Sequence, residues 1–212
     1  MTVKELNDNY KIILASASPR RKQILELVGL EFDVWPSCAE ENTSETDPEK
    51  LCTSLSGAKA IDVAAQIRAY NDTHRELTTP GDIIVIGADT VVACNGEVFG
   101  KPRDEADAVR MLKALSGRTH SVYTGVSFVF ISSGGRAGEY TFFEETKVSF
   151  YPLDEQEIEY YMSSYDVYDK AGSYGIQDGS AAFVRSIEGD YYNVVGLPVS
   201  RLLHELKRIL QV

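Results

Sequence analysis

Residues 10–30, YKIILASASPRRKQILELVGL, decide how the fold begins. Apolar residues 12–14 predict a buried strand, the next four small and hydroxyl residues predict a tight loop, and an amphipathic helix follows. Ser18 is a preferred N-cap, and Pro19 fits the first helical position because the N–H it lacks would have no partner there. The residues expected on the apolar face of the helix, with the glycine expected to end it, are Ile24, Leu25, Leu27, Val28 and Gly29.

Two arginines in the first turn of this helix indicate an anion site. The free N–H groups of a helix N-terminus already make that end positive, so the helix dipole alone disfavours cations there. Arg20 and Arg21 nevertheless occupy the first turn, next to the hydroxyls of Ser16 and Ser18. Together these groups favour phosphate binding. A solvated first turn whose arginines merely face water is the alternative.

The composition limits the class of protein. A chain of 212 residues with 43% hydrophobic and 25% charged residues is typical of one globular domain, which we expect to span residues 1–212. No apolar run approaches the roughly 18 residues that cross a membrane, and the N-terminus lacks the apolar core of a signal peptide, so we expect a cytoplasmic protein without membrane contact. Three widely spaced cysteines predict neither a disulfide framework nor a zinc site.

The formal net charge of −11 argues against a nucleic-acid binder, which would carry a basic surface. It leaves room for a small anionic ligand, provided that the ligand finds a local cationic pocket. Such pockets often include a divalent metal held by carboxylates.

The remaining pattern predicts an α/β fold with a mixed, twisted sheet flanked by helices. Strands alternate with helices, yet the middle strands read as antiparallel hairpins, with Asn95-Gly96 as the strongest turn signal. Residues 71–82 are expected to be a loop that tolerates insertion. The other expected elements are strands at 31–37, 83–93, 97–99, 121–131, 140–151 and 182–187, and helices at 48–70, 104–116, 154–164 and 199–210.

Asp89 is the first candidate for a reactive group. It ends an apolar run, so we expect its carboxylate at the exit of a buried strand, a usual position for ligand sites in α/β sheets. Its small neighbours, among them Gly87, would let a ligand approach. An aspartate that caps its own turn is the alternative. Glu40 or Glu41, in the acidic loop after the second strand, could join Asp89 around Mg²⁺, and two solvated glutamates are the alternative there.

Other polar residues give weaker signals. Lys59 lies within a long helix and by itself indicates a surface lysine. Lys101 follows a hairpin strand, and the glycine before it would let a phosphate come close, although a surface lysine is an equally simple interpretation. The histidines, His120 among them, have no nucleophile at a catalytic spacing.

The segment 169–177, DKAGSYGIQ, has the features of a base-recognition loop. Gly172 and Gly175 permit unusual backbone angles, Tyr174 offers an aromatic face, and Gln177 carries both a donor and an acceptor. A flexible, exposed turn is the alternative.

Seven blocks in order resemble the Maf family of house-cleaning nucleoside triphosphate pyrophosphatases. They cover nearly the whole chain from about residue 12 to residue 210, and neither the short N-terminal extension nor the longer 71–82 segment touches them. The blocks are LASASPRR (14–21), AEE (39–41), AKA (58–60), GADTVV (87–92), GKPRD (100–104), LSGRTHSVYTG (115–125) and DKAGSYGIQ (169–177).

The resemblance implies a fold of two lobes with a central cleft, often assembled as a homodimer. It also implies hydrolysis of a nucleoside triphosphate to the monophosphate and pyrophosphate with a divalent metal, Mg²⁺ first and Mn²⁺ or Co²⁺ as alternatives. Asp89 matches the general base, and Glu41, with Glu40 as a one-residue alternative, matches a carboxylate associated with metal or water. The positions that match phosphate handling are Ser16, Arg20, Arg21, Lys59 and Lys101.

The resemblance further implies the substrate branch. Arg20, Thr90 and Gln177 match positions that characterise dTTP/UTP pyrophosphatases, and the GIQ ending of the 169–177 block is unlike the 7-methyl-GTP branch. Turnover of 7-methyl-GTP or of modified pyrimidine triphosphates is one alternative. A nucleotide-binding, division-related interaction protein with incidental catalysis is another, and a plain phosphatase is a third.

Overall fold

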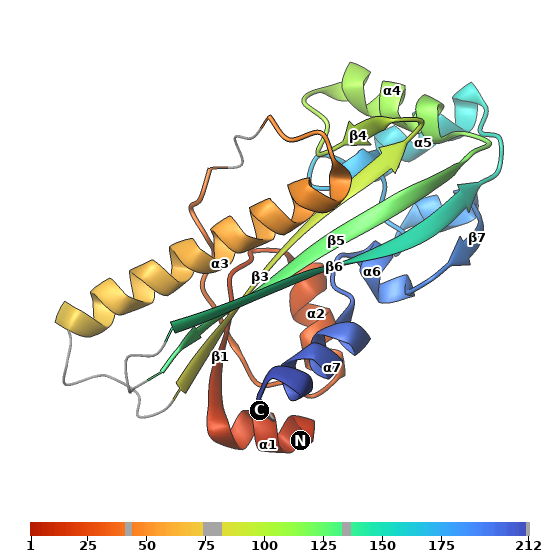
Figure 1. Ribbon diagram of the computed structural model, residues 1–212. Helices are drawn as coiled ribbons and strands as arrows, with labels where there is room; N and C mark the ends of the chain where they lie inside the picture. Colours follow the sequence, from red (N-terminus) through yellow and green to blue (C-terminus); the bar gives the residue numbers. More distant parts are fainter. Residues whose placement is uncertain (41–43, 74–81, 133–136, 211–212) are drawn as a thin grey trace.

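The computed structural model describes residues 1–40, 44–73, 82–132 and 137–210, and its centre is a seven-stranded sheet (Figure 1). The strand order is β2-β1-β3-β5-β6-β7, and β4 pairs with β3. The elements are α1 (Val3–Asn9), β1 (Tyr10–Leu14), α2 (Pro19–Leu27), β2 (Asp33–Val34), α3 (Pro48–Thr73), β3 (Asp82–Cys94), β4 (Glu97–Phe99), α4 (Glu105–Leu115), β5 (Thr119–Ile131), β6 (Ala137–Phe150), α5 (Glu155–Ser164), the 3₁₀ helices η2 (Ala171–Ser173) and η3 (Gly179–Phe183), β7 (Val184–Glu188), α6 (Tyr191–Val195) and α7 (Val199–Leu210).

The mixed sheet confirms the predicted fold class. β1 runs parallel to β2 and β3, whereas β3, β5, β6 and β7 pair antiparallel in that order. The Asn95-Gly96 hairpin is confirmed, since β4 pairs antiparallel with β3 and both turn residues have positive φ angles of 52° and 80°. A two-residue turn of this kind requires those angles.

Residues 10–30 follow the predicted order of strand, loop and helix, with one wrong placement, whereas helix α1 before them was not predicted. The Ser18 side chain caps α2 by accepting a hydrogen bond from the Arg21 N–H, and Pro19 occupies the first turn. Ile24 and Leu25 are buried, but Leu27 is 65% exposed, so its place on the apolar face was predicted wrongly. Two residues at 100° each put Leu27 about 200° around the helix from Leu25, on the side away from the sheet.

Several predicted elements begin or end at other residues in the structure. The second strand covers only two residues of the expected 31–37. Helix α3 continues to Thr73 and takes in the first part of the expected 71–82 loop, and residues 74–81 lie outside the described part. The short helix α6 was not predicted. The helix expected at 154–164 is confirmed as α5, and Asp154 and Glu157 form a capping box at its start.

Helix α3 crosses one face of the sheet (Figure 1), and two strand glycines let its backbone come close to the strands. A Cβ on Gly87 would come within 2.2 Å of the Ser56 backbone oxygen, and a Cβ on Gly125 within 2.3 Å of the Cys52 oxygen. The Ser56 and Ser127 hydroxyls share a hydrogen bond of 2.8 Å across this contact. Gly87 therefore makes room for α3, and the expectation that it makes room for a ligand was wrong.

The other face of the sheet carries two apolar clusters. One includes Ile86 with Leu202 of α7, and the other includes Val92 with Leu112 of α4. Between them, the same strands carry polar residues: the Thr90 and Thr124 hydroxyls lie 3.0 Å apart, and Thr124 donates to the Asn193 carbonyl at 3.1 Å. The long strands thus contribute to both clusters, with polar residues between them.

Candidate active site

A gap in the strand pairing marks the site. β1 pairs with β3 as far as Ile86, and β4 begins to pair with the same edge of β3 at Val92. In the described part of the chain, residues 87–91 have no strand partner on that edge. Asp89 and Thr90 lie in this gap, and successive side chains of a strand point to opposite faces. Asp89 and Thr90 therefore point to opposite faces of β3, yet both line the same pocket.

The position predicted for Asp89 was wrong in one respect. Asp89 does not end its strand, because β3 continues through it for 13 residues in all. The strand that ends is β1, whose last pair is Leu14 with Ile86. The ligand site lies beyond the end of this neighbouring parallel strand, which is where α/β sheets commonly bind ligands.

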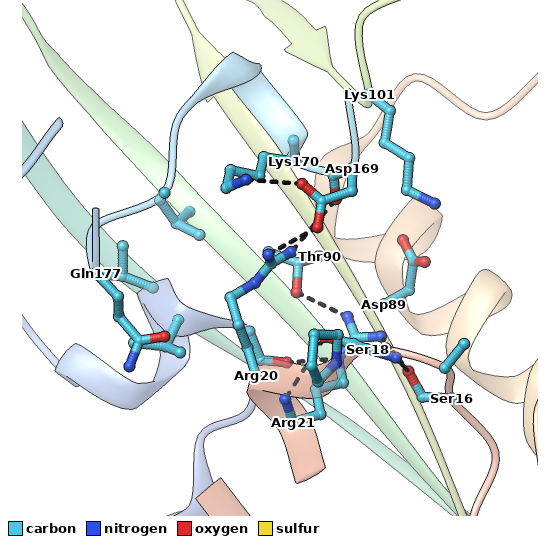
Figure 2. A pocket seen from close by; sticks show the side chains of 18 of the residues that line it. Ser16, Ser18, Arg20, Arg21, Asp89, Thr90, Lys101, Asp169, Lys170 and Gln177 are labelled. Atoms are coloured by element: carbon cyan, nitrogen blue, oxygen red, sulfur yellow. Dashed lines mark hydrogen bonds and ion pairs between the residues drawn. The ribbon is translucent and has the colours of Figure 1, made fainter. Parts of the chain in front are cut away.

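A cavity of about 450 Å³ opens at the gap, within the usual range for small-molecule sites (Figure 2). Five cationic side chains line it against two described carboxylates, although the protein as a whole is strongly acidic. The cavity thus has the local positive charge that an anionic ligand needs. Its charged lining residues are Arg20, Arg21, Lys59, Lys101 and Lys170, with Asp89 and Asp169.

Asp89 and Lys59 line this cavity as a mostly buried ion pair. The Lys59 ammonium lies 2.5 Å from the Asp89 carboxylate, and the two side chains are only 14% and 11% exposed. Lys59 comes from α3, so the close contact of α3 with the sheet places it here. Lys59 alone looked like a surface lysine, and that interpretation was wrong. Lys101, an exposed residue after β4, points its amine toward the same carboxylate (Figure 2).

Arg21 joins three parts of the site. Its guanidinium donates to the Gly196 carbonyl at 2.8 Å, to the Ser16 hydroxyl at 3.1 Å and to the Thr90 hydroxyl at 3.1 Å. These contacts link the loop before α2, the middle of β3 and the turn after α6. Arg21 is thereby held in a fixed place. The alternative in which the two arginines merely face water was wrong.

Arg20 crosses the cavity to Asp169, a residue that was not among the predicted site residues. Its Nη1 lies 2.8 Å from the Asp169 carboxylate, and Asp169 also contacts the Lys170 ammonium at 2.8 Å. Partial burial pushes the pKa of Asp169 upward, but the hydrogen bonds from Lys170 and Arg20 outweigh it and hold the pKa below its usual value. The sequence did offer a signal that could have placed Asp169 in the site: it stands next to the oppositely charged Lys170 at the start of a glycine-rich segment.

A family model described as Maf-like protein matches residues 11–209. The chain belongs to the Maf family. Three similar relatives are each named dTTP/UTP pyrophosphatase. The one from Agathobacter rectalis is 57% identical over 94% of this chain and 97% of its own. The one from Carboxydothermus hydrogenoformans is 47% identical over 93% of this chain and 97% of its own. The one from Bacillus cereus is 46% identical over 97% of this chain and 93% of its own.

Two other predicted residues of the Maf site stand at its edges. Gln177 lines the cavity as an exposed side chain, on the side opposite Asp89 (Figure 2). Ser18 also lines it, and its hydroxyl is the cap of α2. Glu40 is exposed and is not among the residues that line the cavity, whereas Glu41 lies outside the described residues.

Tyr174 lines the cavity but does not offer the free aromatic face that was expected. The residue is 6% exposed, and its ring packs edge-on against His120 and Phe150. Its hydroxyl shares a 2.8 Å hydrogen bond with His120 Nε2. Gly172 has the expected positive φ of 69°, but Gly175 does not have one. Tyr174 is therefore a buried part of the cavity lining, and its ring is not free to stack on a base.

Burial of His120 makes the stability of the protein depend on pH. Burial lowers the pKa of His120 from 6.5 to about 4, and the residue is 2% exposed. In the unfolded chain His120 binds a proton below about pH 6.5, whereas in the folded chain it binds one only below about pH 4. The free energy of unfolding therefore falls as the pH falls through this window. By this linkage His120 removes up to about 3 kcal/mol of unfolding free energy between pH 6.5 and 4.

His120→Gln should therefore flatten the decline in unfolding free energy between pH 7 and 5, measured by urea unfolding. The exposed His204 provides the matched control, since His204→Gln should leave the slope of the wild type unchanged. Equal slopes in all three proteins would show that His120 titrates normally.

Proposed function

We propose that this chain hydrolyses nucleoside triphosphates between the α- and β-phosphates, releasing a nucleoside monophosphate and pyrophosphate, with dTTP and UTP as its substrates. The observation that carries the proposal is the Asp89 carboxylate, which lies among cationic side chains in a cavity otherwise suited to a polyanion. The names of the relatives support the same activity and the same substrates.

The cations of the cavity suit a triphosphate. Lys59 of α3, Arg21 of α2 and Lys101 of the loop between β4 and α4 line the same cavity as Asp89, so they can contact different phosphates of one triphosphate. Negative charge grows on the pyrophosphate as it leaves. Cations already fixed in place stabilise that charge without reorganisation, and in many enzymes this stabilisation lowers the barrier more than any other single effect.

Asp89 is placed to act as the general base. One carboxylate oxygen accepts from Lys59, and the side chain lines the cavity. In the proposed step Asp89 takes a proton from a water molecule while the water oxygen bonds to the α-phosphorus. The bond from that phosphorus to the α,β-bridging oxygen breaks, and the electron pair leaves with pyrophosphate. Such a base contributes typically 10²- to 10⁴-fold in rate.

A divalent metal, Mg²⁺ first, is part of the proposal. Among the described residues no group of three His, Cys, Asp or Glu could enclose an ion. Mg²⁺ is usually held by one or two carboxylates, substrate phosphates and water, and Asp89 suits that arrangement as one carboxylate. We propose Glu41 as a second. When bound, the ion would lower the pKa of the attacking water and offset phosphate charge.

We also propose that the protein is cytoplasmic and that it forms a homodimer. Cys38, Cys52 and Cys94 are free thiols, which suits the reducing cytoplasm. The described part contains no helix that is long and apolar enough to cross a membrane. A homodimer stays a prediction.

Incubation with each nucleoside triphosphate and Mg²⁺, followed by identification of the products, tests the function. We expect UTP and dTTP to give monophosphate and pyrophosphate faster than ATP, GTP, CTP or 7-methyl-GTP. EDTA should abolish turnover and excess Mg²⁺ should restore it. Release of orthophosphate would contradict the reaction, faster turnover of 7-methyl-GTP would contradict the substrate, and tight binding without turnover would favour an interaction protein.

A further inference from the structure

The ion pair between Arg20 and Asp169 differs from the other charged contacts of the cavity. Two nitrogens of one guanidinium contact the same residue: Nη1 donates to the Asp169 carboxylate at 2.8 Å, and Nη2 donates to the Asp169 carbonyl at 3.3 Å. Two contacts fix the plane of the guanidinium as well as its position. Arg20 is therefore held toward the 169–177 segment, and its charge is already offset there (Figure 2).

Asp169 is itself held by a chain of contacts that leads to Gln177. Lys170, whose side chain is 13% exposed, lies 2.8 Å from the Asp169 carboxylate and 3.9 Å from that of Asp178. Asp178 accepts a 3.0 Å hydrogen bond from the Tyr161 hydroxyl. Because Asp178 directly follows Gln177, the position of Gln177 depends on the same charges that hold Arg20.

The segment is shaped around this chain of charges. A Cβ on Gly175 would lie 2.7 Å from Lys170 Cε and 2.8 Å from an Asp178 carboxylate oxygen, so a larger residue there would push the ends of these two side chains out of place. The Gly172 N–H also donates to the Gly100 carbonyl at 3.0 Å, which joins the segment to the residue before Lys101. The contacts thus form a packed wall of the cavity, which ends at Gln177 on the side opposite Asp89 (Figure 2).

We propose that Asp169 is a positioning residue for base selectivity. It holds Arg20 away from the triphosphate and, through Lys170 and Asp178, sets the wall that presents Gln177 to the base. Arg21, Lys59 and Lys101 are left to bind the phosphates. The proposal rests on the proposed function, because it assigns this wall to the base of the same substrate.

Asp169→Asn tests the proposal, since the amide keeps the size of the side chain but loses its charge. We expect KM for UTP to rise about tenfold, kcat to change less than threefold, and the preference for UTP over ATP, in kcat/KM, to fall about tenfold. Inhibition by pyrophosphate should stay within twofold of the wild type. Arg20→Lys should lose the same preference, and the double variant should lose no more than either single variant.

Asp33→Asn is the matched control, because Asp33 is an exposed aspartate that pairs with Lys11 at the far edge of the sheet. It should leave every kinetic constant unchanged. If Asp169→Asn instead lowers KM equally for all triphosphates and tightens pyrophosphate inhibition, Arg20 is a phosphate ligand restrained by Asp169, and the proposal is wrong. An unchanged base preference would also overturn it.

Binding of monophosphates separates this proposal from the proposed function. UMP and AMP carry the base without a reaction, so their dissociation constants can be measured by calorimetry even if no triphosphate is hydrolysed. Wild-type protein should prefer UMP, and Asp169→Asn should lose about tenfold of that preference. Equal preferences in the two proteins would reject the role of Asp169, whatever the enzyme assay shows.

Discussion

Asp89→Asn is expected to lower kcat by about 10²- to 10⁴-fold while the protein keeps its fold. An amide has nearly the volume of the carboxylate but cannot accept the proton of the attacking water. Asp89 is only 8% exposed, yet it lines the cavity and pairs with Lys59. The amide oxygen can still accept the Lys59 hydrogen bond, so we expect the loss in kcat to exceed any change in substrate binding.

Asp107→Asn is the matched control for this substitution. Asp107 is also a buried, paired carboxylate, 6% exposed and bound to Arg103 and Arg110, but it does not line the cavity. Its replacement should lower thermal stability and leave kcat within twofold. Steady-state kinetics with UTP, together with circular dichroism of each variant, makes the comparison. Half of the wild-type kcat in Asp89→Asn would reject Asp89 as the base.

Gly87→Ala is expected to lower the free energy of unfolding by about 3 kcal/mol or more. The added Cβ would lie 2.2 Å from the Ser56 oxygen and 2.8 Å from the Ala60 nitrogen, and both are backbone atoms of α3. Backbone atoms cannot rotate away as a side chain can, so the helix itself has to move. Because α3 carries Lys59, activity should fall along with stability.

Gly57→Ala provides the control on the facing helix. A Cβ on Gly57 would have its nearest neighbour at 3.7 Å, the Ser127 hydroxyl, which is ordinary contact. Alanine is also the better helix former, so this variant should gain about 0.5–1 kcal/mol. Urea unfolding of both variants measures the difference. An unfolding free energy of Gly87→Ala within about 0.5 kcal/mol of the wild type would show that α3 is not packed as closely as described.

Local features of the fold could be predicted because neighbouring residues determine them. The Ser18 cap, the Asn95-Gly96 turn and the Asp154 capping box each need only a few adjacent residues. Leu27 was misplaced because the part of a short helix that meets a sheet is decided by packing and not by hydrophobicity alone. The short second strand reflects the same limit.

The site was predictable as a set of residues but not as an arrangement. The family blocks pointed to Asp89, Lys59 and Lys101, and the structure brings all three to one cavity. Contact between Lys59 and Asp89 depends on the closeness of α3 to the sheet, which follows from Gly87 and was not evident in the sequence. The Arg20 partner Asp169 was missed because it lies 149 residues away along the chain.

We propose that water attacks the α-phosphorus of the substrate in the Asp89 cavity. The most direct measurement is hydrolysis of UTP in water enriched in oxygen-18, followed by mass spectrometry of both products. Attack at the α-phosphorus places the heavy oxygen in UMP and leaves pyrophosphate unlabelled, which is the predicted result. Heavy oxygen in pyrophosphate, with unlabelled UMP, would mean attack at the β-phosphorus and would contradict the account.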